Sequence, residues 1–173
     1  MENHSIKNGL LSGSVSIVFS LMLYLVNPEF MITWGSYLGI FIVIYFMRKA
    51  IIDTKKDENG YITLGQAFKV SWLTYILGTV ISTFFLYIMI NYIDQSLVDI
   101  LKKVQIDTFE KTGNFLNMTE DMIQEQVSIM EDTNPFGPSA IALSLPLSFL
   151  FPGAIISIIM AAIMKKKHPQ NEI

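Results

Sequence analysis

Few residues of this chain have the types and spacing that chemistry needs. The two histidines, His4 and His168, lie in polar segments near the chain ends, and the sequence predicts that neither meets a carboxylate pair. The chain has no cysteine, which excludes thiol nucleophiles, disulfides and zinc-thiolate sites. Phosphate-binding loops, dinucleotide fingerprints and zinc-protease motifs are also missing. We therefore expect a non-catalytic protein without cofactor, metal or nucleic-acid partner.

The one strongly charged stretch lies between positions 94 and 138, where nine acidic residues face three lysines. Asp121 and Glu125 are four residues apart, which places both carboxylates on one helix face. A divalent cation is one interpretation of this pair. A calcium loop, however, needs regularly spaced oxygen ligands and a glycine turn, which the stretch does not have. A solvated polar face is the preferred interpretation.

The element that organises the chain is the uncharged run at positions 70–93, between Lys69 and Asp94. As a helix it is about 36 Å long, which exceeds the hydrocarbon thickness of about 30 Å. Helix is the only single-segment structure that satisfies its backbone in lipid. The composition agrees, because 51% of the residues are hydrophobic, only 16% are charged and the mean hydropathy is +0.45. The sequence thus predicts an integral membrane protein.

Three further apolar runs, at 9–26, 30–47 and 139–164, complete a predicted bundle of four spans in a single domain. A secretory signal peptide is the alternative for the first run. It requires a small-x-small cleavage site, whereas Val26 is followed by Asn27, Pro28 and Glu29. The predicted fold class is therefore all-α, an integral membrane four-helix bundle.

The cations predict the orientation of these spans. With a cytoplasmic N-terminus, nine of the twelve Lys and Arg residues lie on the cytoplasmic side, as the positive-inside rule requires. An even number of spans places the C-terminus on the same side. The nine residues are Lys7, Arg48, Lys49, Lys55, Lys56, Lys69, Lys165, Lys166 and Lys167.

The segment 94–138 is predicted to form an amphipathic helical cap on the outer ends of the bundle. Leu97, Ile100, Leu101 and Val104 recur at helical spacing, and a second apolar face begins at Met122. The break between the two helices is expected at positions 112–114. Asn117 is expected to cap the second helix, with Glu120 as the reciprocal acid.

Small residues on the predicted spans indicate how the helices pack, since helices in lipid associate where small side chains let backbones approach. Gly35 and Gly39 lie one turn apart on the second span, Gly78 lies on the third and Gly153 on the fourth. Packing seams are the preferred interpretation, and a pore lining is the alternative. Two prolines in the last span, Pro146 and Pro152, predict kinks.

The stretches IKNGLLSG and YITLGQAFKVSW, the acidic helical segment and the proline-bearing last span resemble a family of small four-span membrane proteins of unknown function, found mainly in Bacteroidetes. The resemblance implies a location in the bacterial inner membrane and supplies no activity. Gly65, Gln66, Phe68 and Lys69 match its most recognisable stretch. We expect them to seat the third span at the cytoplasmic interface, with a ligand site as the alternative.

Two functional hypotheses follow. The first is a non-catalytic membrane module that contacts the lipid bilayer and a protein partner. The second is a small carrier or channel, formed by self-association because four short spans enclose little space. The lack of charged residues within the spans favours the first hypothesis, because ion pumps and proton-coupled carriers usually retain such residues. An intramembrane enzyme is a distant third possibility.

Overall fold

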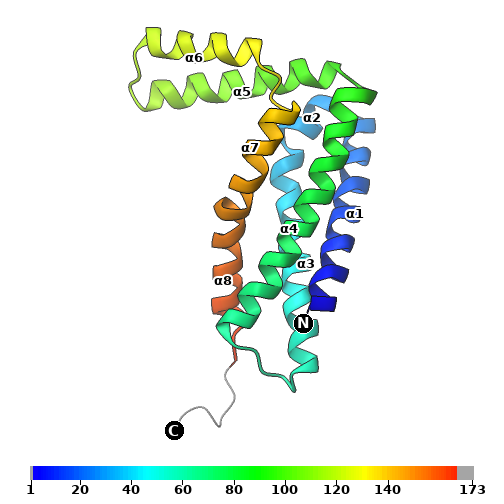
Figure 1. Cartoon of the computed structure of the whole chain (residues 1–173). Helices are drawn as coiled ribbons and strands as arrows, with labels where there is room; N and C mark the ends of the chain where they lie inside the picture. The colour runs from blue at the N-terminus through cyan, green and yellow to red at the C-terminus, as the bar shows by residue number, and fades with distance from the viewer. Residues whose placement is uncertain (1, 167–173) are drawn as a thin grey trace.

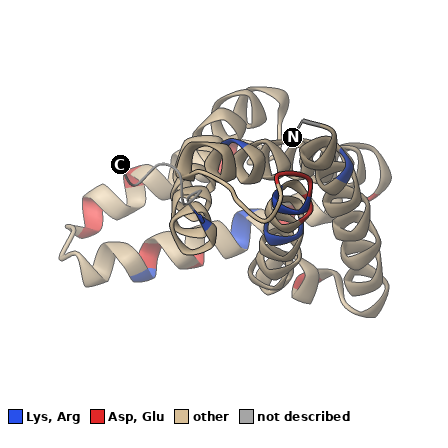
Figure 2. Cartoon of the chain, turned by 90° about the horizontal axis from the view of Figure 1, so that it is seen from below, with Lys and Arg blue, Asp and Glu red and all other residues tan. Residues whose placement is uncertain are grey.

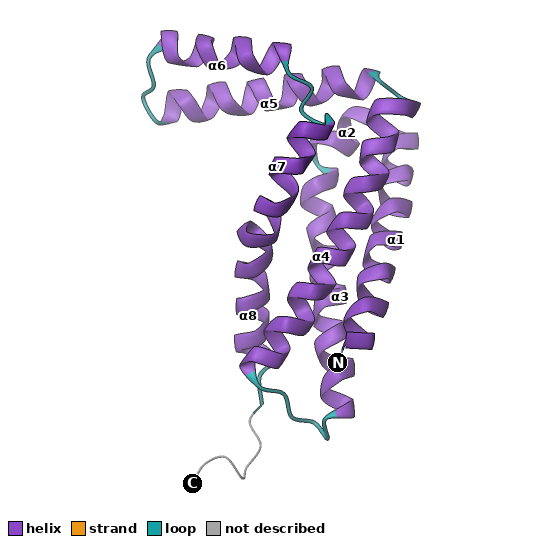
Figure 3. Cartoon of the chain, viewed as in Figure 1, coloured by secondary structure: helices purple, strands orange, loops and turns teal. Residues whose placement is uncertain are grey.

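The computed structural model describes residues 2–166, and all regular secondary structure in that range is helical (Figure 3). The only β-type pairing there is a single antiparallel bridge between Ile62 and Lys166. The elements are α1 (Glu2–Val26), α2 (Pro28–Thr33), α3 (Gly35–Asp57), α4 (Leu64–Ile88), the π-helical η1 (Met89–Ile93), α5 (Ser96–Phe115), α6 (Glu120–Asp132), α7 (Pro138–Ser148), the π-helical η2 (Phe149–Ala154) and α8 (Ile155–Met164).

The helices α1, α3, α4 and the α7–η2–α8 run lie side by side, while α5 and α6 cross one end of this bundle (Figure 1). We call that end the arm end, and the pair α5–α6 the arm. The opposite end, which holds the start of α1 and the α3–α4 turn, is the basal end. Helix α4 is central, since it contacts α1, α3, α8 and η2.

Three helical runs are long and apolar enough to cross a membrane: Asn3–Val26, Leu64–Ile93 and Pro138–Met164. The expectation of membrane-spanning helices at 9–26, 70–93 and 139–164 is confirmed to that extent. The run predicted at 30–47 is interrupted instead. Trp34 caps both α2 and α3, and α3 carries the charged residues that follow Met47 in its second half.

Two boundary predictions at the basal end are wrong. The polar start of the chain was expected outside the first span, but α1 begins at Glu2. The polar residues 50–65 were expected to form a turn-rich connection after the second span, but α3 continues to Asp57. The turn is confined to residues 58–63, where Asn59 and Gly60 adopt the left-handed conformation at φ 54° and 86°. Polar residues therefore do not mark the ends of these two helices. The polar start of α1 and the polar end of α3 are both helical and form hydrogen bonds with each other.

The last helical run is broken at only one of its two prolines. Pro146 lies inside α7, whereas η2 contains Pro152 and a non-helical residue before it, Phe151 (φ −134°, ψ 116°). The indole Nε1 of Trp72 on α4 donates to the Phe149 carbonyl, 2.9 Å away. A carbonyl next to the break is thus bonded within the protein, as lipid surroundings require.

The arm follows the predicted two-helix plan but not the predicted position. Helix α5 runs through the expected break and ends at Phe115, and the cap of α6 is Thr119, whose hydroxyl accepts from the Met122 N–H. Asn117 lies in the turn with φ 56°. Only the first part of α5 rests on the bundle, and the rest of the arm extends sideways past α7 (Figure 1).

Candidate functional site

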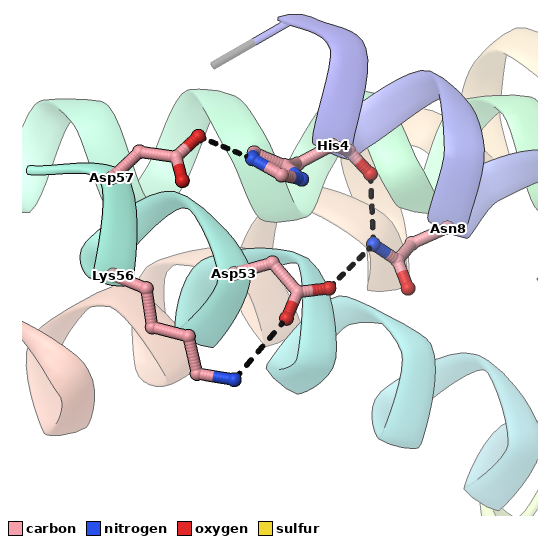
Figure 4. A network of polar contacts seen from close by, with 5 residues as sticks. All are labelled: His4, Asn8, Asp53, Lys56 and Asp57. Atoms are coloured by element: carbon pink, nitrogen blue, oxygen red, sulfur yellow. Dashed lines mark hydrogen bonds and ion pairs between the residues drawn. The ribbon is translucent and has the colours of Figure 1, made fainter.

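A polar network joins α1 to α3 at the basal end (Figure 4). The His4 Nε2 atom lies 2.6 Å from Asp57 Oδ2. The Asn8 side-chain amide donates to the His4 carbonyl at 2.9 Å and to Asp53 Oδ2 at 3.4 Å. Lys56 lies 3.8 Å from Asp53. The network therefore contains one imidazole, two carboxylates, one amide and one ammonium group.

The sequence predicts no carboxylate pair at His4, and the structure places a single carboxylate, that of Asp57, against its ring. Both α1 and α3 extend beyond the predicted spans, and their ends bring His4 against a carboxylate 53 positions away in the chain. His168 lies outside the described residues. Within residues 2–166, no group of three His, Asp or Glu residues is placed to hold a metal ion.

The four residues of the YITLGQAFKVSW stretch do not converge on one site. Gln66 forms a capping box with Thr63: its Oε1 accepts from the Thr63 N–H at 2.9 Å, and its own N–H donates to the Thr63 hydroxyl at 3.3 Å. Phe68 stacks on Trp72, with ring centroids 5.7 Å apart. Gly65 and Lys69 are exposed. The stretch thus starts α4 and orients it, which is a structural role.

The basal end is closed by contacts among three segments. The bridge of Ile62 with Lys166 consists of two backbone hydrogen bonds of 2.9 Å. Lys55 Nζ donates to the Met164 carbonyl at the end of α8, at 3.1 Å, as cations commonly do at helix C-termini. The ammonium of Lys166 lies 5.2 Å from the centre of the Tyr61 ring. These contacts fix α3, α4 and α8 relative to one another.

The predicted packing glycines fall into two groups. A Cβ at Gly78 would lie 2.9 Å from the Ser12 hydroxyl, and one at Gly153 would lie 2.5 Å from the Tyr75 ring, so both glycines occupy close helix contacts. A Cβ at Gly35 would meet Leu23 at 3.2 Å. No atom lies within 4 Å of the corresponding position at Gly39. Gly39 therefore does not take part in a tight helix contact.

Gly35 and Gly39 instead border a cavity of about 460 Å³ inside the arm half of the bundle. Side chains from α1, α2, α3, α4, α5 and the α7–η2 run surround it, and all of these lining side chains are uncharged. Six of them carry hydroxyl groups: Ser16, Ser20, Tyr75, Thr79, Ser82 and Ser148. Its volume lies within the range of about 300–1,000 Å³ that is usual for small-molecule sites. The cavity is the best-formed candidate binding site.

Two polar side chains attach the arm to the bundle. Asp94 accepts from the Tyr24 hydroxyl at 2.8 Å and from the hydroxyl and N–H of Ser96 at 2.6 and 3.0 Å. These hydrogen bonds, first that of the Ser96 side chain and then that of Tyr24, lower the pKa of Asp94 below its ordinary value. Asn91 donates to the Phe136 carbonyl at 3.0 Å and accepts from the Asn134 amide at 3.0 Å. The arm is thus held at both of its connections.

With this geometry established, the chain can be compared with known proteins. The model of a family described as "Protein of unknown function (DUF4199)" matches residues 7–166. The chain belongs to the DUF4199 family. The resemblance to a family of unknown function is confirmed at that level, and the match spans the bundle and the arm of this family member. No curated protein and no solved structure matches it.

The sequence-based interpretation missed Asn8, Asp53 and Asp57. A signal for them exists in the spacing: Ser5, Asn8, Ser12 and Ser16 recur every three or four residues, and each is buried in the structure. The same spacing relates Ala50, Asp53, Thr54 and Asp57. Extending the helical period through polar residues would have carried both helices to their observed ends.

Proposed function

We propose that this protein is a non-catalytic membrane module with four spans, whose arm contacts its partners at the outer face of a bacterial inner membrane. The three apolar helical runs support a membrane location. The uncharged first part of α3 lies side by side with α1 and α4, which supports its assignment as the remaining span (Figure 1). The bundle then crosses the membrane with α2 near the outer interface.

The distribution of charge supports a cytoplasmic basal end. Seen along the bundle axis, the helices of the bundle are largely uncharged, while the arm carries acidic and basic residues (Figure 2). The cations near the ends of α1, α3, α4 and α8 lie at the basal end, where the positive-inside rule expects the cytoplasm. In the proposed orientation both ends of the described range lie in the cytoplasm and the acidic arm lies outside.

The proposed function rests on the direction in which the apolar side chains of α5 point. Leu97 is fully buried against Met31, Met89 and Ile90 at the end of the bundle. Phe115 follows 18 residues later, which is five turns of about 3.6 residues, so the two side chains leave the helix in the same direction. Beyond α7 that direction meets no protein, and Phe115 is 83% exposed. We infer that the arm lies along the bilayer surface with Phe115 toward the lipid.

Topology can be tested with two reporters. A reporter joined after Lys166 should be cytoplasmic, and one inserted after Asn117, in the turn of the arm, should be external. Asn117 suits insertion better than Gly113, because a Cβ at Gly113 would already meet Ile123 at 3.1 Å. The opposite location at either site contradicts the proposed orientation.

The lipid contact of the arm can be tested separately, because the chain has no cysteine and accepts single spin labels cleanly. In liposomes, a label at Phe115→Cys should be more accessible to oxygen than to a water-soluble nickel chelate. Glu110→Cys, an exposed position on the opposite side of α5, is the matched control and should show the reverse. A water-accessible Phe115 position would contradict the lipid contact and leave a basic protein surface as the partner of the acidic arm.

A second candidate function, a small-solute carrier, is favoured by one specific observation. The hydroxyl-bearing cavity lies beside the break in the last helical run, and discontinuous spans often border the binding sites of transporters. A flux assay in liposomes, joined to a subunit count in native-like lipid, tests this candidate. Flux equal to that of protein-free liposomes for every solute tried contradicts it.

A further inference from the structure

A buried polar face of α1 connects the basal network to the cavity. Ser5, Asn8, Ser12 and Ser16 lie on this face, and Ser16 also lines the cavity together with Ser20. Asn8 and Ser12 are fully buried, although an asparagine is larger than close helix packing requires. On α3, the fully buried Thr54 follows Asp53, which accepts a hydrogen bond from Asn8.

Three buried polar atoms, two on this face of α1 and one on the neighbouring α3, have no hydrogen-bond partner within residues 2–166: Asn8 Oδ1, Ser12 Oγ and Thr54 Oγ1. The orientation of the Asn8 amide is fixed, because its nitrogen donates to the His4 carbonyl at 2.9 Å. Leaving a buried polar group unsatisfied is unfavourable. Buried water normally satisfies such groups in native proteins. The polar face of α1 therefore offers polar atoms that can bind a path of water molecules.

The cavity at the end of this path has a lining that suits an uncharged ligand. All of its lining side chains are neutral, so a charged ligand would be buried there without a counter-charge, which is strongly unfavourable. The Ser82 hydroxyl donates to the Gly78 carbonyl at 2.9 Å, and the Ser148 hydroxyl donates to the Leu145 carbonyl at 2.7 Å. Their oxygens remain as acceptors for donors on a ligand.

We propose that the cavity binds a small uncharged solute bearing several hydroxyl groups, and that the polar face of α1 hydrates the cavity from the basal end. This inference rests on the second candidate function and names its substrate class. A hydroxyl group supplies both a donor and acceptors for the serine, threonine and tyrosine hydroxyls, while the carbon chain of such a solute packs against the apolar side chains that form the rest of the lining.

The hydration is tested with single cysteines in the cysteine-free chain, reconstituted in liposomes and treated with a membrane-impermeant methanethiosulfonate. Ser16→Cys and Ser20→Cys, at the cavity, are compared with Val15→Cys and Val18→Cys, which are exposed on the other side of the same helix at similar depth. The serine positions should react at least about ten times faster, because the reactive thiolate forms only where water reaches the thiol. Equally slow reaction at all four positions would overturn the hydrated path.

The solute class is tested by protection of the same cysteines. Glycerol should slow modification of Ser16→Cys and Ser20→Cys, whereas glycine, of similar size but zwitterionic, should not. Thr79→Cys, on α4, provides a third cavity position if either serine variant fails to fold. Protection by neither solute, or by both equally, would overturn the assignment of an uncharged polyol.

Different results would contradict the proposed binding site and the proposed carrier function. Protection by glycerol without glycerol flux would contradict transport and support the binding site. Glycerol flux that persists without protection would overturn the binding site and support a carrier that uses another route. A lipid in the cavity would show as slow modification at all cavity positions in liposomes and faster modification in delipidated detergent solution, which also overturns the proposal.

Discussion

The two ends of the bundle pack differently. At the basal end, Ala50, Ala67 and Ala161 are fully buried where α3, α4 and α8 meet. At the arm end, α7 buries none of its residues, and its only substantial contact among the described elements is with the adjacent η2. Helices in lipid approach closely only where side chains are small. Helix α7 lies apart from α3, and Ser148 at its end lines the cavity.

The largest expected effect is on the arm, because the buried cluster around Leu97 packs it against the bundle. Leu97→Ala should destabilise the attachment of α5 by about 2–5 kcal/mol, the usual range for a buried leucine. Hydrogen exchange should accelerate in α5 and remain slow in the basal halves of α3 and α4. Leu116→Ala, at the exposed tip, is the control and should change exchange little. Equal effects of the two variants would contradict the role of the cluster.

The glycine contacts provide the second test. A Cβ at Gly13 would lie 2.6 Å from the Ile81 side chain, so Gly13→Ala should destabilise the α1–α4 contact by about 1–3 kcal/mol. Gly39→Ala should be neutral or slightly stabilising, because its Cβ enters open space and alanine favours helix. Thermal unfolding in detergent and in lipid measures both variants. Loss of stability in Gly39→Ala would show that the arm half packs as tightly as the basal half.

Asp94 provides a smaller effect that depends on pH. Its hydrogen bonds with Ser96 and Tyr24 hold its pKa below the ordinary value of 3.8. The carboxylate therefore stabilises the arm attachment above pH 3.8, and the contribution is lost as the pH falls through the lower, folded-state value. The mobility of a spin label at Lys103→Cys should rise in that acid range. Asp94→Asn should remove this acid-dependent rise, whereas Asp107→Asn should preserve it.

The smallest expected effect is at the basal network. His4 and Asp57 are both partly exposed, and such pairs contribute about 0.2–1 kcal/mol. His4→Gln should therefore lower the unfolding temperature only slightly, in agreement with a basal end that depends on its alanine contacts. A large loss would show that the polar network between α1 and α3 contributes much more to stability than an exposed pair does.

The apolar runs predicted the long helices because their signal is local: about 20 uncharged residues must be helical in lipid. The positions of the glycines also predicted two close contacts, Gly78 and Gly153. Contacts between distant residues were not predictable in the same way. The helical spacing extends both helices through their polar residues, but it does not show that His4 and Asp57 meet. The open space beside Gly39 likewise depends on the path of other helices. The cavity is therefore a property of the assembled bundle and has no motif of its own.

The break at residues 149–154 divides the last helical run into two parts with different attachments. Helix α8 is fixed at the basal end, where Ala161 is fully buried and Met164 accepts from Lys55. Helix α7 buries no side chain and is connected through η2 on one side and through residues 133–137, bonded to Asn91, on the other. We expect a bend at η2 to move α7, and with it Ser148 in the cavity lining, without exposing the basal core.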